Sequence, residues 1–265
     1  MPPVVVLLTP GPFISTYYGQ SFQADEMGIE LVEGPDLMVD DGYVHKRTTR
    51  GLRRVDVVYR RIDDAFPDPL AFRADSMSGV PRLIAAKSLG NVTIVDAVGT
   101  GIADDKAVHR YVPQMIRFFL AEEPLLENGP TWQCGNVDDC SHVLDRLPEL
   151  VVKDVNRSGR YGLLVGPHSS RETIAEFHRK IVSAPGRLIA QPTLSLSKCP
   201  TFVESGVAPR HVDLRPYALC GNGHDGNIDV PLVPGALTRV ALPAGSLVVN
   251  SRQGGGTKDT RAVDQ

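Results

Sequence analysis

The chain has 265 residues, of which 42% are hydrophobic and 22% charged, an ordinary composition for a globular protein. Its formal net charge of −3 gives no electrostatic reason to expect nucleic acid or an anionic membrane as a partner. The four cysteines have no CxxC spacing and follow no secretory leader, which favours reduced thiols and a cytoplasmic location over a disulfide framework or a zinc knuckle.

The first hundred residues alternate short apolar runs with helical segments. A helix is expected over residues 17–27, where Gly28 suits the C-terminal stop. Strands are expected over residues 4–8, 29–33, 55–59 and 92–95. This alternation predicts an α/β fold with a parallel sheet, so residues 1–100 are predicted to form a Rossmann-like layer. They lack the GxGxxG fingerprint, so a dinucleotide is not implied.

Residues 101–265 have a different pattern and are predicted to form a second, α+β region. Asp104 or Asp105 is a candidate helix cap, and the apolar face that follows continues past Pro113. The run Ser169-Ser170-Arg171-Glu172 matches a capping box ahead of another helix. Mostly antiparallel strands are expected over residues 150–153, 163–165, 188–190, 211–219, 238–242 and 246–250. The polar tail after Asp259 is expected to fray.

Two lysines are candidate phosphate ligands. Lys153 ends a predicted strand just before a turn that contains Ser158, Gly159 and Gly162. Backbone N–H groups of such a turn bind phosphate oxygens, and an ammonium neutralises their charge. An ordinary Gly-containing hairpin with a nearby surface lysine is the alternative. Lys106 lies at a predicted helix start and is either a solvated lysine beside capping acids or a second phosphate ligand.

Arginines on two later strands are candidates for anion binding. His211, Asp213 and Arg215 share one face of a predicted strand, and Arg239 is a candidate to join that face from another. The face is either a solvent-exposed ion pair or a cleft wall in which the guanidinium of Arg215 binds a phosphate or carboxylate.

The segment of residues 250–259 is unusual because three successive glycines follow an apolar run. Asn250, Gln253 and Lys258 are its candidate binding residues. Close backbone approach to a ligand explains the glycines, whose ordering is entropically costly. A flexible linker is the alternative.

Seven separated motifs together resemble one family, the circularly permuted ATP-grasp type 2 family, which is related to glutathionylspermidine synthetase-like amide ligases. The resemblance follows the chain in order along almost its whole length. Its motifs are Thr9-Pro10-Gly11-Pro12, residues 59–64 (Tyr-Arg-Arg-Ile-Asp-Asp), Asp104-Asp105-Lys106, Val152-Lys153 with its turn, Ile189-Ala190-Gln191-Pro192, residues 211–216 and residues 250–259.

The resemblance implies a Rossmann-like pre-ATP-grasp layer followed by an ATP-grasp domain that binds ATP and Mg²⁺. It implies an amide ligase that joins a carboxylate to an amine through an acyl-phosphate, with a small molecule or a peptide as substrate. Lys106, Lys153 and the turn of residues 158–162 would hold phosphates, and Gln191 falls at the adenine hinge. Arg215 and Arg239 would stabilise the transferred phosphoryl group, a role that suits guanidinium.

Two departures from the family pattern bear on catalysis. Arg160 stands in the turn where the family has a small residue, and it either crowds the phosphate or adds positive charge. The chain also resembles only the later part of a full-length member, whose upstream segment could be encoded separately. The family has an acidic ExN metal motif, but in this chain the residue two before Asn250 is Val248 and not a carboxylate. No pair of Mg²⁺ carboxylates is apparent in the sequence.

The leading interpretation is therefore an ATP-dependent carboxylate–amine ligase, or the ATP-binding portion of one. The alternative is a non-catalytic or truncated nucleotide-binding subunit that lacks metal ligands.

Overall fold

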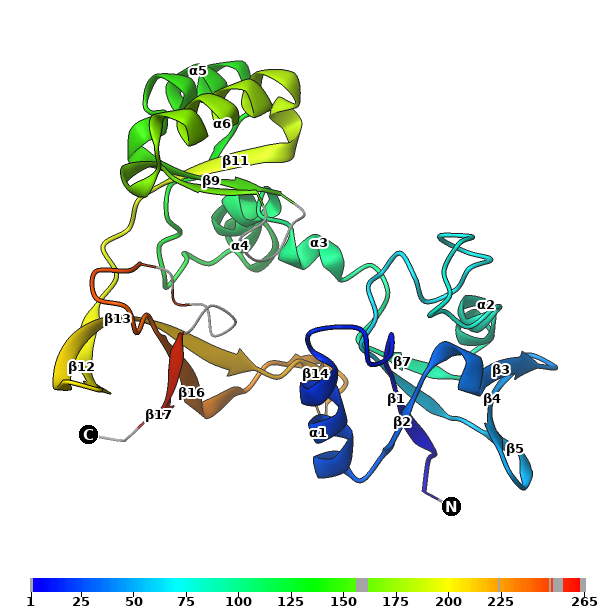
Figure 1. Cartoon of the computed structure of the whole chain (residues 1–265). Coiled ribbons are helices and arrows are strands. Elements are labelled where there is room, and N and C mark those ends of the chain that lie inside the picture. Colours follow the sequence, from blue (N-terminus) through cyan, green and yellow to red (C-terminus); the bar gives the residue numbers. More distant parts are fainter. Residues whose placement is uncertain (1, 156–161, 224, 248, 250–254, 263–265) are drawn as a thin grey trace. The chain divides into compact units, whose positions relative to one another are not determined.

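A computed structural model describes residues 2–155, 162–223, 225–247, 249 and 255–262 of the chain. The chain divides into two compact units, Met1–His109 and Arg110–Gln265 (Figure 1). No helix within the described ranges is long and apolar enough to cross a bilayer.

The first unit is built on a parallel four-stranded sheet in the order β2-β1-β6-β7. Its strands are β1 (Val5–Leu8), β2 (Glu30–Val32), β6 (Val57–Arg60) and β7 (Thr93–Val95). An antiparallel meander consists of β3 (Leu37–Asp40), β4 (Tyr43–Thr48) and β5 (Gly51–Arg54). The helical segments are α1 (Tyr17–Met27), η1 (Gly34–Asp36), α2 (Leu83–Ser88), α3 (Gly101–Asp104) and η2 (Val108–Tyr111), the last of which crosses the unit boundary.

The end of α1 and the core of the first unit follow from residue types in the sequence. Helix α1 ends at Gly28 in the left-handed conformation, where its amide bonds the carbonyls of Ala24 and Asp25. Val6, Leu7 and Leu8 of β1 and Val58 of β6 are fully buried, as expected for a parallel sheet that is covered on both faces. The core joins strand residues to the meander and α2, and it includes Val6, Leu8, Val58, Leu37, Val44, Val55, Leu83 and Ala86. The predicted α/β fold with a parallel sheet is confirmed.

The second unit contains an antiparallel sheet in the order β10-β9-β11-β8, covered on one face by α5 and α6 (Figure 1). Its strands are β8 (Trp132–Gln133), β9 (Leu150–Asp154), β10 (Leu163–Val165) and β11 (Leu188–Pro192). The helical segments are α4 (Val112–Leu120), α5 (Val137–Asp145), η3 (Leu147–Glu149), η4 (Gly166–His168), α6 (Arg171–Ser183) and η5 (Pro185–Arg187).

A second antiparallel sheet, in the order β12-β13-β16-β17, completes this unit. Its strands are β12 (Lys198–Val203), β13 (Gly206–Ala218), β16 (Leu232–Val240) and β17 (Gly256–Arg261). The small hairpin of β14 (Gly221–Asn222) and β15 (Ile228–Asp229) lies between β13 and β16 in the chain.

Three local predictions need correction. Residues 246, 247 and 249 were expected within a strand but are irregular. The last strand is instead β17, which includes Thr260, a residue of the tail that was expected to fray. The cap of α6 is Ser170, whose hydroxyl accepts from the amide of Thr173, because Ser169 instead donates to the carbonyl of Val165. The meander and β12 were not predicted, because β5 and most of β12 are exposed and give little hydrophobic pattern, and the apolar run of β3 is only four residues long.

Candidate nucleotide site

One face of the sheet β10-β9-β11-β8 carries Lys153 and Gln191, two of the candidate nucleotide-binding residues. Val152 and Ala190 point into the core beneath α5 and α6. Because successive side chains of a strand alternate, Lys153 and Gln191 point to the opposite face. Helices α5 and α6 therefore do not cover the face that carries Lys153 and Gln191.

A chain of hydrogen bonds orders the side chains on this face. The ammonium of Lys153 donates to Oε1 of Gln191 at 2.8 Å. Nε2 of Gln191 donates to the hydroxyl of Thr131 at 2.9 Å, and that hydroxyl donates to the carbonyl of Gly129 at 3.2 Å. Thr131 is buried, while Lys153 and Gln191 are half-buried. The lysine thus lies at the accessible end of an ordered amide–hydroxyl chain.

A pocket of about 310 Å³ lies against β10, the strand that pairs with the strand of Lys153. Leu163 and Val165 line it and lie directly opposite Lys153 and Val151 in the β9–β10 pair, so they share the face of Lys153. Its remaining lining comes from His168, Ser169, Gly245, Ser246 and Leu247. The volume lies at the lower end of the range for small-molecule sites.

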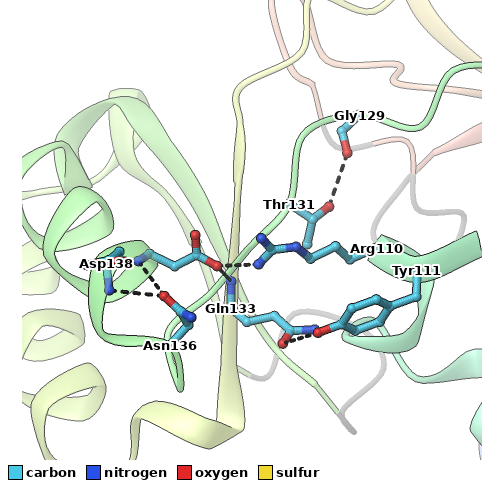
Figure 2. Close-up of polar contacts among 8 residues, drawn as sticks. Arg110, Tyr111, Gly129, Thr131, Gln133, Asn136 and Asp138 are labelled. Carbon is cyan, nitrogen blue, oxygen red and sulfur yellow. Dashed lines mark hydrogen bonds and ion pairs between the residues drawn. The ribbon is translucent and has the colours of Figure 1, made fainter. Parts of the chain in front are cut away.

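A second polar network fixes the edge strand β8 (Figure 2). Asn136 caps α5, and its side-chain oxygen accepts from the amides of Asp138 and Asp139 at 3.0 and 3.1 Å. One oxygen of Asp139 accepts from the amide of Gln133 at 3.0 Å and pairs with Arg110. The hydroxyl of Tyr111 donates to the side chain of Gln133 at 3.3 Å. These bonds hold the segment before α4 against β8, beside the face of Lys153.

The candidate arginines lie on the sheet β12-β13-β16-β17. Arg239 is directly opposite Asp213 and donates to both of its carboxylate oxygens, with Nε at 2.8 Å from Oδ1. Arg215 lies on the same face but is exposed and opposite Leu237. Lys258 is opposite Thr238, so it lies on the other face, where it donates to the carbonyl of Pro200. The structure therefore brings Arg239 and Arg215 to one face and separates Lys258 from them.

The other candidates are dispersed or lie outside the described residues. Lys106 is half-buried between α3 and η2 in the first unit. Gly162 closes the β9–β10 hairpin with φ of 80°, and its carbonyl accepts from the amide of Asp154 at 3.1 Å. Ser158, Gly159, Asn250 and Gln253 lie outside the described residues, as does Arg160.

The carboxylates that the structure describes do not fit a Mg²⁺ site. Among the residues that the structure describes, no three His, Cys, Asp or Glu side chains are grouped so that they could bind a metal ion. Asp213 is engaged by Arg239, and Asp259 is an exposed residue opposite Leu237. Magnesium prefers a near-octahedral set of oxygens, which these separated groups do not supply.

The sequence analysis missed Thr131, Gln133 and the pair of Arg110 with Asp139. Strand β8 has only two residues, so hydrophobic periodicity could not reveal it. The available signal was Asn136 followed by two acids, the pattern of a capped helix start.

These features define an α/β protein whose second unit has a hydrogen-bonded lysine and a ligand-sized pocket on neighbouring strands of one sheet. Comparison with known proteins then supplies the family. The chain belongs to the circularly permuted ATP-grasp type 2 family, whose model matches residues 1–241. The resemblance inferred from the seven motifs is confirmed.

Relatives and a solved structure agree with this assignment. An uncharacterised protein from Synechocystis is 55% identical over 97% of this chain and 53% of its own length. A putative glutamate–cysteine ligase from Frankia alni is 42% identical over 97% of this chain and 29% of its own length. The chain thus spans about half the length, or less, of these relatives. The D-alanyl-alanine synthetase A of Vibrio cholerae has a similar fold, with a TM-score of 0.52 at 10% identity over 98% of this chain and 74% of that one.

Proposed function

We propose that this chain is the ATP-binding part of an ATP-dependent carboxylate–amine ligase. The observation that carries the proposal is the Lys153–Gln191 hydrogen bond on the sheet face opposite α5 and α6, the face to which the pocket-lining Leu163 and Val165 also belong. Membership of the ATP-grasp family and the ligase name of the Frankia relative support it. The substrates are small molecules or peptides.

The proposed reaction has two steps. A substrate carboxylate oxygen attacks the γ-phosphorus of ATP, and ADP leaves with the electrons of the broken P–O bond. The amine nitrogen then attacks the acyl carbon of the acyl-phosphate, inorganic phosphate leaves, and the amine loses a proton. Charge on the transferred phosphoryl group is the main electrostatic demand, which cationic side chains meet.

The residues of this chain take roles within that scheme. Lys153 holds a phosphate as a point charge, and Gln191 orders the lysine and lies at the adenine hinge. Leu163 and Val165 of β10 pack against the base. Arg239, oriented by Asp213, and the exposed Arg215 stabilise the phosphoryl group. The proposed contributions of Lys106, Ser158, Gly159, Gly162, Asn250, Gln253 and Lys258 to phosphate binding rest on the family pattern.

Calorimetric titration of ATP into the chain, with and without Mg²⁺, tests the proposal. Lys153→Met should weaken ATP binding by about ten- to a hundredfold, because a charge-assisted bond contributes about 1.5–3 kcal/mol. Lys87→Met, at an exposed lysine of α2, is the matched control and should bind ATP like the parent. Parent-like affinity in a folded Lys153→Met variant would remove Lys153 from the site, and failure of the parent to bind ATP would overturn the proposal.

A further inference from the structure

The parallel sheet of the first unit has an edge at which ligands characteristically bind. From β1 the chain crosses to β2 on one side and later returns to β6 on the other side of β1. The strand order therefore reverses between β1 and β6. In open α/β sheets, ligands bind outside the carboxyl ends of the strands at such a switch point.

Hydrogen bonds fix the backbone at this edge just beyond the strands. The amide of Arg61 donates to the carbonyl of Leu8, and the amide of Thr9 donates to that of Val32, both at 2.9 Å. The buried side chain of Gln20, from α1, accepts from the Thr9 hydroxyl at 2.6 Å and donates to the Arg61 carbonyl at 3.5 Å. The positions after β1 and β6 are thus fixed relative to each other.

Arg60, the last residue of β6, and Arg61, which follows it, have different environments. Arg60 is buried and donates to the carbonyls of Ile62, Asp96 and Ala97 at 2.6, 3.2 and 3.2 Å, and it pairs with Asp64 at 2.7 Å. The N–H groups of its guanidinium therefore hold the loops that follow β6 and β7. Arg61 is exposed, and no ion-pair partner is recorded for it among the residues that the structure describes.

An opposite charge lies on the other side of β1. Glu33 follows β2 and is half-buried. Gly11 has φ of 101°, and a Cβ at this position would lie 3.2 Å from the carboxylate of Glu33, so that carboxylate lies close against the turn after β1. Within the described ranges, no ion pair involves Glu33. Arg61, which follows β6, and Glu33, which follows β2, are thus positioned on either side of the end of β1.

We propose that this edge binds the zwitterionic end of an amino acid, with its carboxylate on Arg61 and its ammonium on Glu33. A guanidinium binds a carboxylate through two parallel N–H groups, and a glutamate oxygen accepts from an ammonium. The inference rests on the proposed function in one respect, which is that the bound amino acid is a substrate of the ligase. It gives the Arg61 of the Tyr-Arg-Arg-Ile-Asp-Asp motif a binding role and Arg60 a positioning role.

Saturation-transfer NMR on the whole chain tests the site with L-glutamate and with glutarate, which lacks the ammonium group. The parent should bind glutamate more tightly than glutarate. Arg61→Gln should weaken both ligands at least tenfold, and Glu33→Gln should weaken glutamate to the level of glutarate without weakening glutarate. Arg53→Gln, at an exposed arginine of β5, is the matched control and should leave both affinities unchanged.

Two results would overturn the inference: no binding of glutamate to the parent, or parent-like binding by a folded Arg61→Gln variant. Calorimetry with ATP separates this failure from failure of the proposed function. Arg61→Gln should bind ATP like the parent, because its change lies outside the proposed nucleotide site. If the parent binds no ATP while glutamate binding still depends on Arg61, the ligase proposal fails and the amino-acid site stands.

Discussion

The ion pair of Asp213 with Arg239 allows a quantitative test of the sheet that carries the candidate arginines. Both side chains are mostly buried, with 27% of Asp213 and 22% of Arg239 exposed, and the guanidinium donates to both carboxylate oxygens. Exposed pairs contribute about 0–1 kcal/mol, whereas removing one partner of a fully buried pair costs about 3–5 kcal/mol. The intermediate burial predicts a coupling free energy of about 1–2 kcal/mol.

A double-mutant cycle measures this coupling. Asp213→Asn, Arg239→Gln and the double variant are unfolded in urea, and unfolding of the second unit is followed by fluorescence of Trp132, the one tryptophan of the chain. Asp213→Asn keeps the side-chain volume, so the cycle isolates the loss of charge. Arg215→Gln, at an exposed position, is the control and should change the free energy of unfolding by less than about 0.5 kcal/mol.

The same variants separate a structural role of Arg239 from a role in phosphate binding. If Asp213 orients Arg239 for a phosphoryl group, Arg239→Gln weakens ATP binding and Asp213→Asn weakens it less, because the cation remains. A coupling below about 0.5 kcal/mol, the range in which distant sites add independently, would refute the energetic reasoning.

Three further results are expected. Burial, with smaller contributions from Cys140 and Asp139, raises the pKa of Cys134 to about 12. Ellman's reagent at pH 8 should therefore modify the exposed Cys220 and reach Cys134 only after unfolding. Rapid labelling of Cys134 in the native protein would contradict its burial. Gly34→Ala should lower the free energy of unfolding by about 1–3 kcal/mol, because the new Cβ would lie 2.6 Å from a backbone oxygen. Its control, Gly19→Ala within α1, meets no atom within 4 Å and should stabilise by about 0.5–1 kcal/mol in thermal unfolding. The chain alone should release phosphate from ATP far more slowly than a complete ligase, because its described carboxylates are not grouped to hold a metal; substrate-stimulated release at a ligase rate would contradict this.

The elements that the sequence predicted well are those with dense local signals. The apolar run of β1 and the helix that ends at Gly28 combine hydrophobicity with a clear stop, so α1 was predicted with its observed bounds. The meander gives no such signal, since all of β5 is exposed and Lys46 is buried on β4 beside Glu30, a partner from another strand. A strand whose stability comes from pairing is not encoded in its own pattern.

The last strand illustrates the same limit. Residues 246–249 are apolar enough to predict a strand, yet the chain there is irregular where described, and the polar segment Gly256–Arg261 pairs with β16 instead. In the candidate site, Lys153 was predicted from its place on a strand before a Ser/Gly turn, and Gln191 from the family resemblance. Their hydrogen bond to each other and to Thr131 depends on the pairing of β9, β11 and the segment before β8, which no short stretch of sequence contains.

The bond between Lys153 and Gln191 also determines how an affinity for this site should be understood. The amide has one orientation that serves both neighbours, because its oxygen must accept from Lys153 while its nitrogen donates to Thr131. The ammonium of Lys153 has three N–H donors, so a phosphate oxygen accepts one of them while Gln191 keeps another and holds the lysine in place. The measured affinity then includes the benefit of a lysine that is already held in place, and a glutamine-to-leucine change at this position would lower it.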